Sequence, residues 1–288
     1  MPSTYPRLST LAQWSSAGPW QAELPHSCPH HALIWITRGQ GRALIGGVRR
    51  GVGVHNALVI PAGTLFALDV GRQGFGLVCE IPPGGAALMP DEPQHLRLRD
   101  VQAQAELTAI LDAMQREQNT ARPFLDEAMN AHAALLSVWL RRTMIDHTDD
   151  RPARPTAAQR LVTAYAALIE RDYRTGKPMA DYARALGVTP THLTRTCQGC
   201  AGLGASKLLT QRSLHEARVL LETGDQPFKQ IAAMLGFRSA AYFSRFVQHH
   251  TGLTPTALRR KAQTQPAAAQ PGVAPRTGIA PGPARRMG

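Results

Sequence analysis

The chain has 288 residues, of which 43% are apolar, and a formal net charge of +12. It is long enough for two domains, because domains usually span about 100 to 150 residues. It contains no run of about 18 uncharged apolar residues, it lacks a secretory signal at its start, and its four cysteines are too few for a disulfide framework. We therefore expect a cytoplasmic protein that makes no membrane contact.

The positive charge is unevenly distributed along the chain. Residues 1–156 carry 14 basic and 14 acidic side chains, residues 157–261 carry 15 and 6, and residues 262–288 carry 3 and none. A neutral first half joined to a basic second half predicts that the second half meets nucleic acid. The alternative is a basic surface that serves solubility alone.

The segment from His31 to Pro82 consists of short apolar, β-branched runs separated by glycine-containing turns. These runs are "ALIWITR", "RALIGGV", "ALVIPAG" and "FGLVCEIP". Strands at such close spacing are typical of a β-sandwich or a small barrel. We therefore assign residues 1–100 to a β-domain.

Helical periodicity begins at about Val101 and forms two long runs. In the second run one stripe is formed by Ala128, Ala131, Leu135, Val138 and Trp139. Such a helix either covers the sheet or pairs with a second subunit, so residues 101–146 are predicted to be the dimerisation segment of a homodimer. Residues 147–156, charged and with two prolines, are the predicted linker.

The second half, residues 157–261, is helical throughout and contains an internal repeat. Residues 182–202 and 231–252 share Ala-x-x-Leu-Gly, a short turn, an apolar-x-Arg pair, and a glycine nine residues after that apolar position. Two copies are too few for a solenoid and suit two helix-turn-helix units. The last segment, 262–288, is rich in Ala, Pro and Gly and is predicted to be disordered.

Each copy of the repeat contains the signals that end one helix and start the next. Gly187 and Gly236 stand where a left-handed residue ends the first helix. Thr189 and Ser239 stand where a side chain caps the second helix. These signals predict that both second helices begin within a few residues of their turns.

Helical spacing divides each second helix into an inward and an outward stripe. The inward stripes are Leu193, Thr196, Cys197 and Cys200 in the first copy and Phe243, Phe246, Val247 and His250 in the second. The outward residues, our candidates for DNA contact, are Thr191, His192, Thr194, Arg195 and Gln198 in the first copy and Ala240, Ala241, Ser244, Arg245 and Gln248 in the second. The outward stripes contain no carboxylate, which favours a surface that meets phosphate over an ordinary two-layer helical domain.

The region from about Thr156 to Arg260 resembles the DNA-binding domain of the AraC/XylS family of bacterial transcription regulators. The resemblance rests on "YARALGVTPTHLTR" and above all on "GFRSAAYFSRFVQHHTGLTPTALRR". It implies two helix-turn-helix units joined by a long helix, with recognition helices roughly 34 Å apart on one face of DNA. Two features depart from the family pattern: Cys197 replaces the usual Phe, and residues 202–206 lack the usual Ser-Pro.

The first half resembles the cupin-like β-barrel that such regulators commonly carry. The resemblance rests on "HSCPHHALIWITRGQGRALIGG" and "NALVIPAGTLFAL". The implied fold class is therefore α+β and multidomain: a cupin-like β-barrel with following helices, then an all-α domain with two helix-turn-helix units. His26, His30 and His31 lie near the first motif, but no glutamate follows, and Phe66 takes a histidine position in the second. We therefore expect no metal and no cofactor.

A cupin barrel without metal can still enclose a small molecule. Trp35, Phe66, Phe75 and His30 are the candidate effector-binding residues. The alternative is that the histidines are simply strand-end or pocket-lining residues.

The Cys197-x-x-Cys200 pair lacks a second pair, and both thiols fall on the inward stripe, so we interpret it as structural. The sequence contains no P-loop, no G-x-S-x-G elbow and no H-E-x-x-H, and we expect no enzymatic activity. Three hypotheses remain: a homodimeric transcription regulator with a sensor domain, a cupin-type enzyme with a DNA-binding appendage, and a nonspecific nucleic-acid binder.

Under the first hypothesis the partner is double-stranded promoter DNA, with a small-molecule effector and, for an activator, contact with RNA polymerase. Arg195 and Arg245 are expected to contact guanine edges or phosphates. Ala240 and Ala241 offer no hydrogen bonds to bases, so the first unit is expected to supply more of the sequence discrimination.

Overall fold

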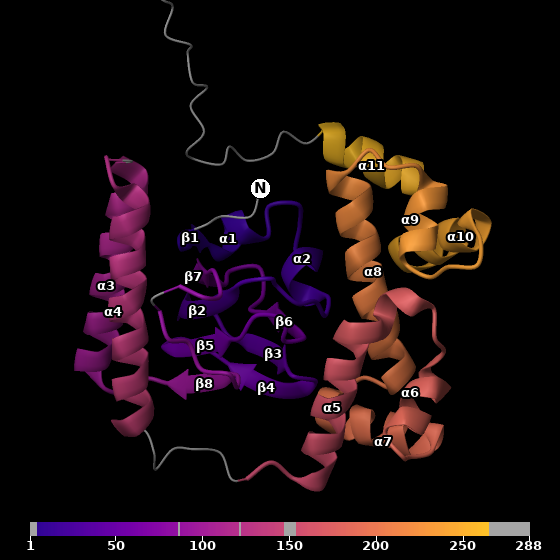
Figure 1. Ribbon diagram of the computed structural model, residues 1–288, viewed down its shortest axis with the longest axis horizontal. Coiled ribbons are helices and arrows are strands. Elements are labelled where there is room, and N and C mark those ends of the chain that lie inside the picture. Colours follow the sequence, from indigo (N-terminus) through magenta and orange to yellow (C-terminus); the bar gives the residue numbers. More distant parts are fainter. Residues whose placement is uncertain (1–4, 86, 121, 147–153, 265–288) are drawn as a thin grey trace, which may run out of the picture.

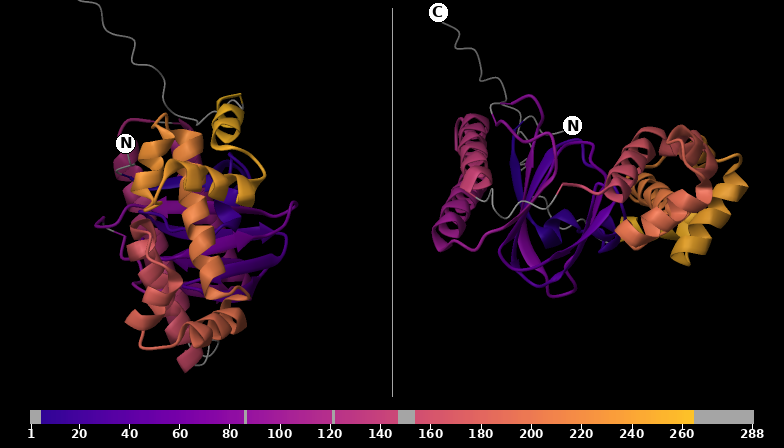
Figure 2. Two further views of the ribbon diagram at one scale, coloured as in Figure 1. Left: turned by 90° about the vertical axis from the view of Figure 1, so that its right-hand side faces the viewer. Right: turned by 90° about the horizontal axis from the view of Figure 1, so that it is seen from below.

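The structure, a computed structural model, describes residues 5–85, 87–120, 122–146 and 154–264. Three parts follow one another across the molecule: the helices α3 (Val101–Thr120) and α4 (Leu125–Asp146), a β region, and a helical region formed by the second half (Figures 1 and 2). The predicted order, a sheet-rich first half before a helical second half, is confirmed. Within the described ranges, no helix combines the length and the apolarity needed to cross a bilayer.

The β region consists of two antiparallel sheets. The five-stranded sheet has the order β1-β7-β2-β5-β8 and the three-stranded sheet the order β4-β3-β6. Two short helices, α1 (Leu11–Trp14) and α2 (Trp20–Glu23), precede β2. The strands are β1 (Arg7–Thr10), β2 (His31–Arg38), β3 (Gly41–Ile45), β4 (Val48–Val52), β5 (Asn56–Ile60), β6 (Phe66–Asp69), β7 (Phe75–Ile81) and β8 (Gln94–Arg97).

Alternation along the strands creates two apolar clusters on opposite faces of the larger sheet. In β2, Ala32, Ile34 and Ile36 join the inner cluster, which also contains residues from all three strands of the smaller sheet. Leu33 and Trp35 point the other way and join the outer cluster, together with buried residues of α3 and α4. The inner cluster therefore holds the sheets together, and the outer cluster attaches the helices.

The buried face of α4 differs from the predicted stripe. Met129, Ala133, Leu136 and Leu140 are buried, whereas Ala131 is exposed and Leu135 is 56% exposed. Trp139 of the predicted stripe is buried and Ala128 and Val138 are half-buried, so the predicted stripe is wrong for Ala131 and Leu135. α3 and the sheet together select the contacting face, and α4 has apolar side chains on both neighbouring faces.

The second half begins after the predicted linker, of which residues 147–153 lie outside the described residues. Of the predicted tail, 265–288 lies outside them as well, and its first three residues continue the last helix. The elements are α5 (Ala157–Asp172), η2 (Tyr173–Thr175), α6 (Met179–Ala185), α7 (Pro190–Ala201), α8 (Ala205–Thr223), α9 (Phe228–Met234), α10 (Ala240–Thr251) and α11 (Pro255–Thr264).

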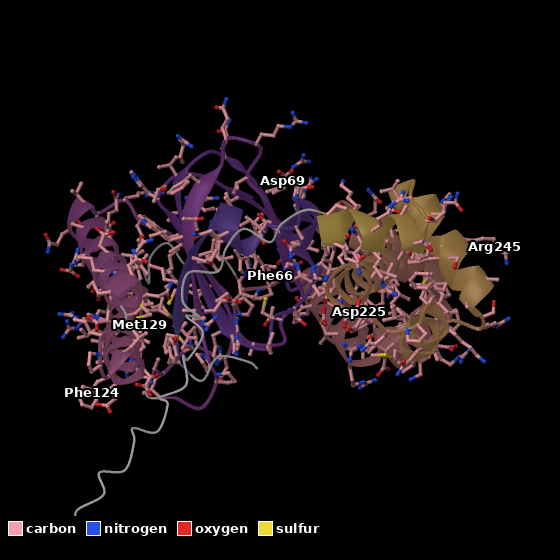
Figure 3. All side chains as sticks on the ribbon, turned by 90° about the horizontal axis from the view of Figure 1, so that it is seen from above. Phe66, Asp69, Phe124, Met129, Asp225 and Arg245 are labelled. Carbon is pink, nitrogen blue, oxygen red and sulfur yellow. The ribbon has the colours of Figure 1, made fainter. Side chains whose placement is uncertain are left out.

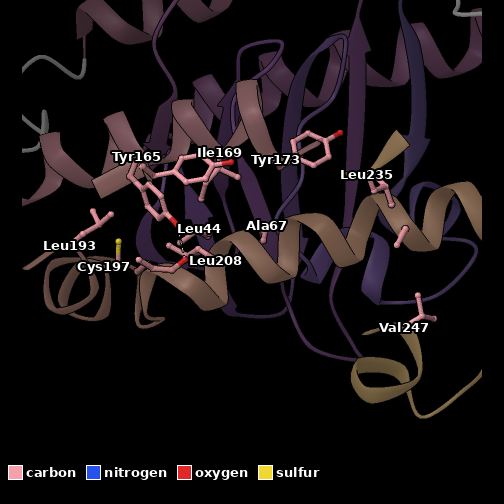
Figure 4. Close-up of a cluster of buried hydrophobic side chains, with 14 of the residues drawn as sticks. Leu44, Ala67, Tyr165, Ile169, Tyr173, Leu193, Cys197, Leu208, Leu235 and Val247 are labelled. Atoms are coloured by element: carbon pink, nitrogen blue, oxygen red, sulfur yellow. Dashed lines mark hydrogen bonds between the residues drawn. The ribbon is translucent and has the colours of Figure 1, made fainter. Parts of the chain in front are cut away.

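The two halves of the chain pack directly against each other. Leu44 of β3 and Ala67 of β6 belong to the same buried cluster as Tyr165 and Ile169 of α5 (Figure 4). Gly47, in the turn between β3 and β4, has a φ of 80°, and a Cβ there would lie 2.7 Å from Cγ1 of Val162. This close approach requires glycine and places β4 against the start of the helical half.

Candidate nucleic-acid interface

The internal repeat corresponds to two pairs of helices, α6 with α7 and α9 with α10. The first helix of each pair buries Ala183 or Ala232 at equivalent positions. The second helices bury Leu193, Cys197 and Ala201 in α7, and Phe243 and Val247 in α10. The other predicted inward residues, Thr196, Cys200, Phe246 and His250, are half-buried.

The predicted caps and helix ends are confirmed in both pairs. Thr189 accepts a hydrogen bond from the backbone N–H of His192, and Ser239 accepts one from the backbone N–H of Tyr242. Gly187 and Gly236 have φ values of 68° and 71°, so both occupy the left-handed region that favours glycine. Local sequence therefore determines where α7 and α10 begin.

Most candidate DNA-contacting residues lie on the outer surface. Thr194, Ala240 and Ser244 are half-buried, and Thr194 packs against Gly204 at the start of α8. The exposed residues are Thr191, His192, Arg195, Gln198, Ala241, Arg245 and Gln248. Gln198 also donates a hydrogen bond from Nε2 to the carbonyl of Gly202, at 3.2 Å, which uses part of its donor capacity at the end of its own helix.

The positive charge of this surface is not compensated locally. No ion pair is recorded within the described residues for Arg195 or Arg245, and Arg245 projects from the outer edge of the helical region (Figure 3). Five of the six carboxylates between residues 157 and 261 form ion pairs inside this half. They are Glu170, Asp172, Asp181, Glu216 and Glu222. The field of the arginines on α7 and α10 therefore extends outward.

Sequence reasoning missed two exposed side chains beside α10. Arg238 lies in the turn before the helix, and Tyr242 in its first turn is 54% exposed. The first residues of a helix that enters the major groove are the ones that reach base edges. The sequence signal that could have identified Tyr242 was an aromatic residue three positions before Arg245 and outside the predicted inward stripe.

The candidate effector residues do not form one pocket. Trp35 lies in the outer cluster and stacks on His55, with 5.9 Å between ring centroids. Phe66 lies in the inner cluster and contacts His26, with 4.4 Å between ring centroids. Phe75 is 41% exposed and His30 is half-buried. Trp35 of the larger sheet points away from the smaller sheet, whereas Phe66, in β6 of the smaller sheet, points into the space between the two sheets.

The thiols and histidines have environments suited to packing. Burial raises the pKa of Cys197 to about 12, the opposite of the lowered pKa that a reactive or metal-binding thiolate needs. His31 Nδ1 accepts a hydrogen bond from the backbone N–H of Ala62, at 3.3 Å. Among the described residues, no three His, Cys, Asp or Glu side chains are grouped so that they could hold a metal ion.

A second polar site lies where the two halves meet. Arg212 of α8 is buried and donates to Glu170, with 2.7 Å between Nε and Oε1. Glu170 in turn accepts a hydrogen bond from the hydroxyl of Ser27, at 2.7 Å, across the contact. Beside this network the rings of His26 and His215 stack in parallel with centroids 4.4 Å apart. One hydrogen-bonded cluster thus joins the β region to the long helix α8.

This helical region therefore contains two capped helix pairs with outward arginines. Residues 182–261 match the family described as "Helix-turn-helix domain". The predicted resemblance is confirmed for this part of the chain, which carries an AraC-type helix-turn-helix domain.

Several curated relatives match parts of this chain. The "Probable bifunctional transcriptional activator/DNA repair enzyme AlkA" of Mycobacterium tuberculosis is 39% identical over 28% of this chain and 16% of its own length. The "HTH-type transcriptional regulator GlxA" of Rhizobium meliloti is 32% identical over 38% and 36%. RhaR, an "HTH-type transcriptional activator" of Salmonella schwarzengrund, is 25% identical over 52% of each chain. The chain thus spans about half or less of the length of these relatives.

Two solved structures are similar at low TM-scores. A single-residue variant of apo ToxT from Vibrio cholerae is 13% identical, with a TM-score of 0.43 over 88% of this chain and 96% of that chain. A transcriptional regulator with an AraC-type DNA-binding domain from Chromobacterium violaceum is 28% identical, with a TM-score of 0.34 over 38% and 96%.

Proposed function

We propose that this protein is a sequence-specific transcription regulator of the AraC type. It binds double-stranded promoter DNA through two helix-turn-helix units, α6 with α7 and α9 with α10. The observation that carries the proposal is the repetition of one capped helix pair whose second helix has an exposed arginine and no carboxylate. The curated relatives that match parts of this chain include proteins named transcriptional regulators or activators, which supports the same function.

In this proposal α7 and α10 are the recognition helices. Arg195 and Arg245 contact guanine edges or phosphates, and Thr191, His192 and Gln198 read bases beside Arg195. Thr194 and Ser244, being half-buried, contribute less than the exposed residues. Ala240 and Ala241 let α10 lie close to the groove and contact thymine methyl groups, so α7 supplies more hydrogen bonds to bases.

The first half acts as the regulatory part. Its two sheets form a cupin-like barrel that receives a small-molecule effector, and residues 101–146 pair with the same segment of a second copy. Support for pairing comes from exposed apolar side chains on this segment: Val101 is 75%, Phe124 is 72% and Leu135 is 56% exposed. An activator of this design also contacts RNA polymerase from its DNA-bound position.

The experiment that tests the proposal is selection of binding sites from a random duplex pool with the full chain at physiological salt. We expect an enriched site with two elements about one turn of DNA apart. On that site Arg195→Ala should weaken binding by about tenfold to a hundredfold and relax the preference at one base pair, because a bidentate contact to guanine contributes about 1–3 kcal/mol.

Arg72→Ala is the matched control, because Arg72 is an exposed arginine in the turn between β6 and β7. It should leave both affinity and base preference unchanged. If no sequence is enriched from the pool, the protein is a nonspecific nucleic-acid binder and the proposal is refuted. Unchanged base preference in Arg195→Ala would refute the role of that residue in readout.

A further inference from the structure

An open groove lies between the two sheets at one edge of the β region. It has a volume of about 650 Å³ and is lined by Gln40 just before β3, by Arg42 of β3, and by Asn56 and Arg97 of β5 and β8. This volume is in the range of small-molecule sites, which is about 300–1,000 Å³. None of the predicted effector residues lines it.

Strand alternation identifies which side chains face this groove from the inside. Val52 of β4 belongs to the inner cluster, so Arg50, two positions earlier, faces the same way. In β8, Leu96 belongs to the outer cluster, so its neighbours His95 and Arg97 face inward. Asn56 is the register partner of Arg97. Arg97 lines the groove, and Arg50 points from the other sheet toward the interior, close enough to Arg97 for the two charges to interact.

The polar groups of this cluster are held in place but lack a counter-charge. His95 donates from Nε2 to Oδ1 of Asn56, at 2.7 Å. Nε of Arg50 is buried and has no hydrogen-bond partner. Within the described residues no ion pair is recorded for Arg42, Arg50 or Arg97. Arg50 as a whole is half-buried, but a buried N–H without a partner is costly, and native proteins normally pair such groups.

The electrostatic environment agrees with this geometry. Burial, followed by the proximity of Arg97, lowers the pKa of Arg50 from its ordinary value. Burial together with Arg97 and Arg50 lowers the pKa of His95 to about 4. Both shifts have the direction expected where positive charges converge without an anion.

We propose that this groove binds a small molecule carrying an oxyanion, either a carboxylate or a phosphate ester, between the guanidinium groups of Arg50 and Arg97. The planar guanidinium fork matches the geometry of both groups. Asn56 and Gln40 give the remaining body of the ligand a polar lining, so the ligand is a small hydrophilic anion. The role of this ligand as the effector rests on the proposed function. The binding of an oxyanion in the groove does not depend on that function.

The same strand connects the groove to the helical half. Arg49, next to Arg50 in β4, points to the opposite side, and a Cβ on Gly202 would lie 2.8 Å from its Nη1. Gly202 caps the C-terminal end of α7. An anion that draws Arg50 toward Arg97 therefore acts on a strand whose other face contacts the end of a proposed recognition helix. A ligand that prefers one position of β4 will shift the placement of α7.

The test measures the melting temperature of the full chain, without DNA, in succinate, in inorganic phosphate and in sodium chloride at equal ionic strength. We expect at least one oxyanion to raise the melting temperature above the chloride value in a saturable manner. The rise should need about tenfold or more oxyanion in Arg50→Met and in Arg97→Met, because each loses a charge-assisted hydrogen-bonding group. Arg97 is exposed, so its replacement leaves the fold intact.

Arg72→Met is the control and should respond like the unmodified chain, since general stabilisation by excluded anions is common to all variants. A response to succinate alone assigns a carboxylate ligand, and a response to phosphate alone assigns a phosphate ester. Equal responses in Arg50→Met and Arg72→Met, or no response beyond chloride, would overturn the proposal. Because DNA is absent, either result leaves the test of DNA binding independent.

Discussion

Acidification should weaken the contact between the two halves of this protein. His26 and His215 are 4% and 8% exposed and stack on each other where the β region meets α8. Arg212 and Arg218 are the charged neighbours on the α8 side, and Arg218 lies over the ring of Trp20, with Cζ 4.2 Å from the centroid. Protonation would place a cation on a buried ring beside two arginines.

The pKa shifts determine the direction and the pH window. Burial, followed by the proximity of Arg212, lowers the pKa of His26 to about 4. Burial, His26 and Arg212 lower the pKa of His215 further. Well above pH 6.5 both rings are neutral in the folded and unfolded chains, so they make no pH-dependent contribution to stability there. Below that value the unfolded chain binds more protons, and stability falls as the pH falls toward 4.

For His26 alone, a shift from about 6.5 to about 4 removes about 2 kcal/mol of stability between pH 7 and pH 5. His215 adds to the loss in the same direction. Urea unfolding at the two pH values, followed by tryptophan fluorescence, measures the change, because Trp14 and Trp20 contact these rings.

A comparison between variants separates the loss of stability caused by protonation of the histidines from the loss caused by protonation of carboxylates over the same pH range. His26→Phe keeps an aromatic ring in the stack but cannot be protonated, so its loss of stability should be about 2 kcal/mol smaller. His249→Phe, which replaces an exposed histidine of α10, should match the unmodified chain. Equal losses in all three proteins would refute the reasoning.

Three further predictions follow from the helical half. Phe243→Ala should lower the free energy of unfolding by about 3–5 kcal/mol, measured in urea, because the ring is fully buried. Glu170→Gln should lower it by about 1–3 kcal/mol, because buried Arg212 would lose its closest carboxylate and keep its ion pair with Glu216. Replacing Ala240 and Ala241 by Gln should narrow the base preference of one half-site in the selection experiment and leave the melting temperature unchanged.

Local sequence determined the boundaries of the helix pairs. A cap such as Thr189 and a left-handed glycine such as Gly236 act within a few residues of their own position, so their effects do not depend on the rest of the fold. The inward positions of Leu193 and Phe243 followed from helical spacing for the same reason. The carboxylate-free outward faces of α7 and α10 were also visible in the sequence.

Contacts between distant segments were decided by the tertiary structure. Period-two alternation shows which residues of a strand share a face, but it does not say which sheet lies opposite or which strands meet at an edge. Trp35 and Phe66 were therefore grouped wrongly, and Arg50 and Arg97, 47 positions apart, gave no sign of their convergence.

The contact between the halves is the clearest case. His26 precedes the β-sheets and His215 lies in α8, 189 positions later, and nothing in either neighbourhood indicates that the rings stack. The sequence by itself determined a DNA-binding domain with its helix boundaries and its exposed arginines. The tertiary structure packs β4 against the helical half and α8 against the β region. This packing determined where an anion or the protonation of a histidine can affect that domain, because burial and converging charge arise only once distant strands and helices are brought together.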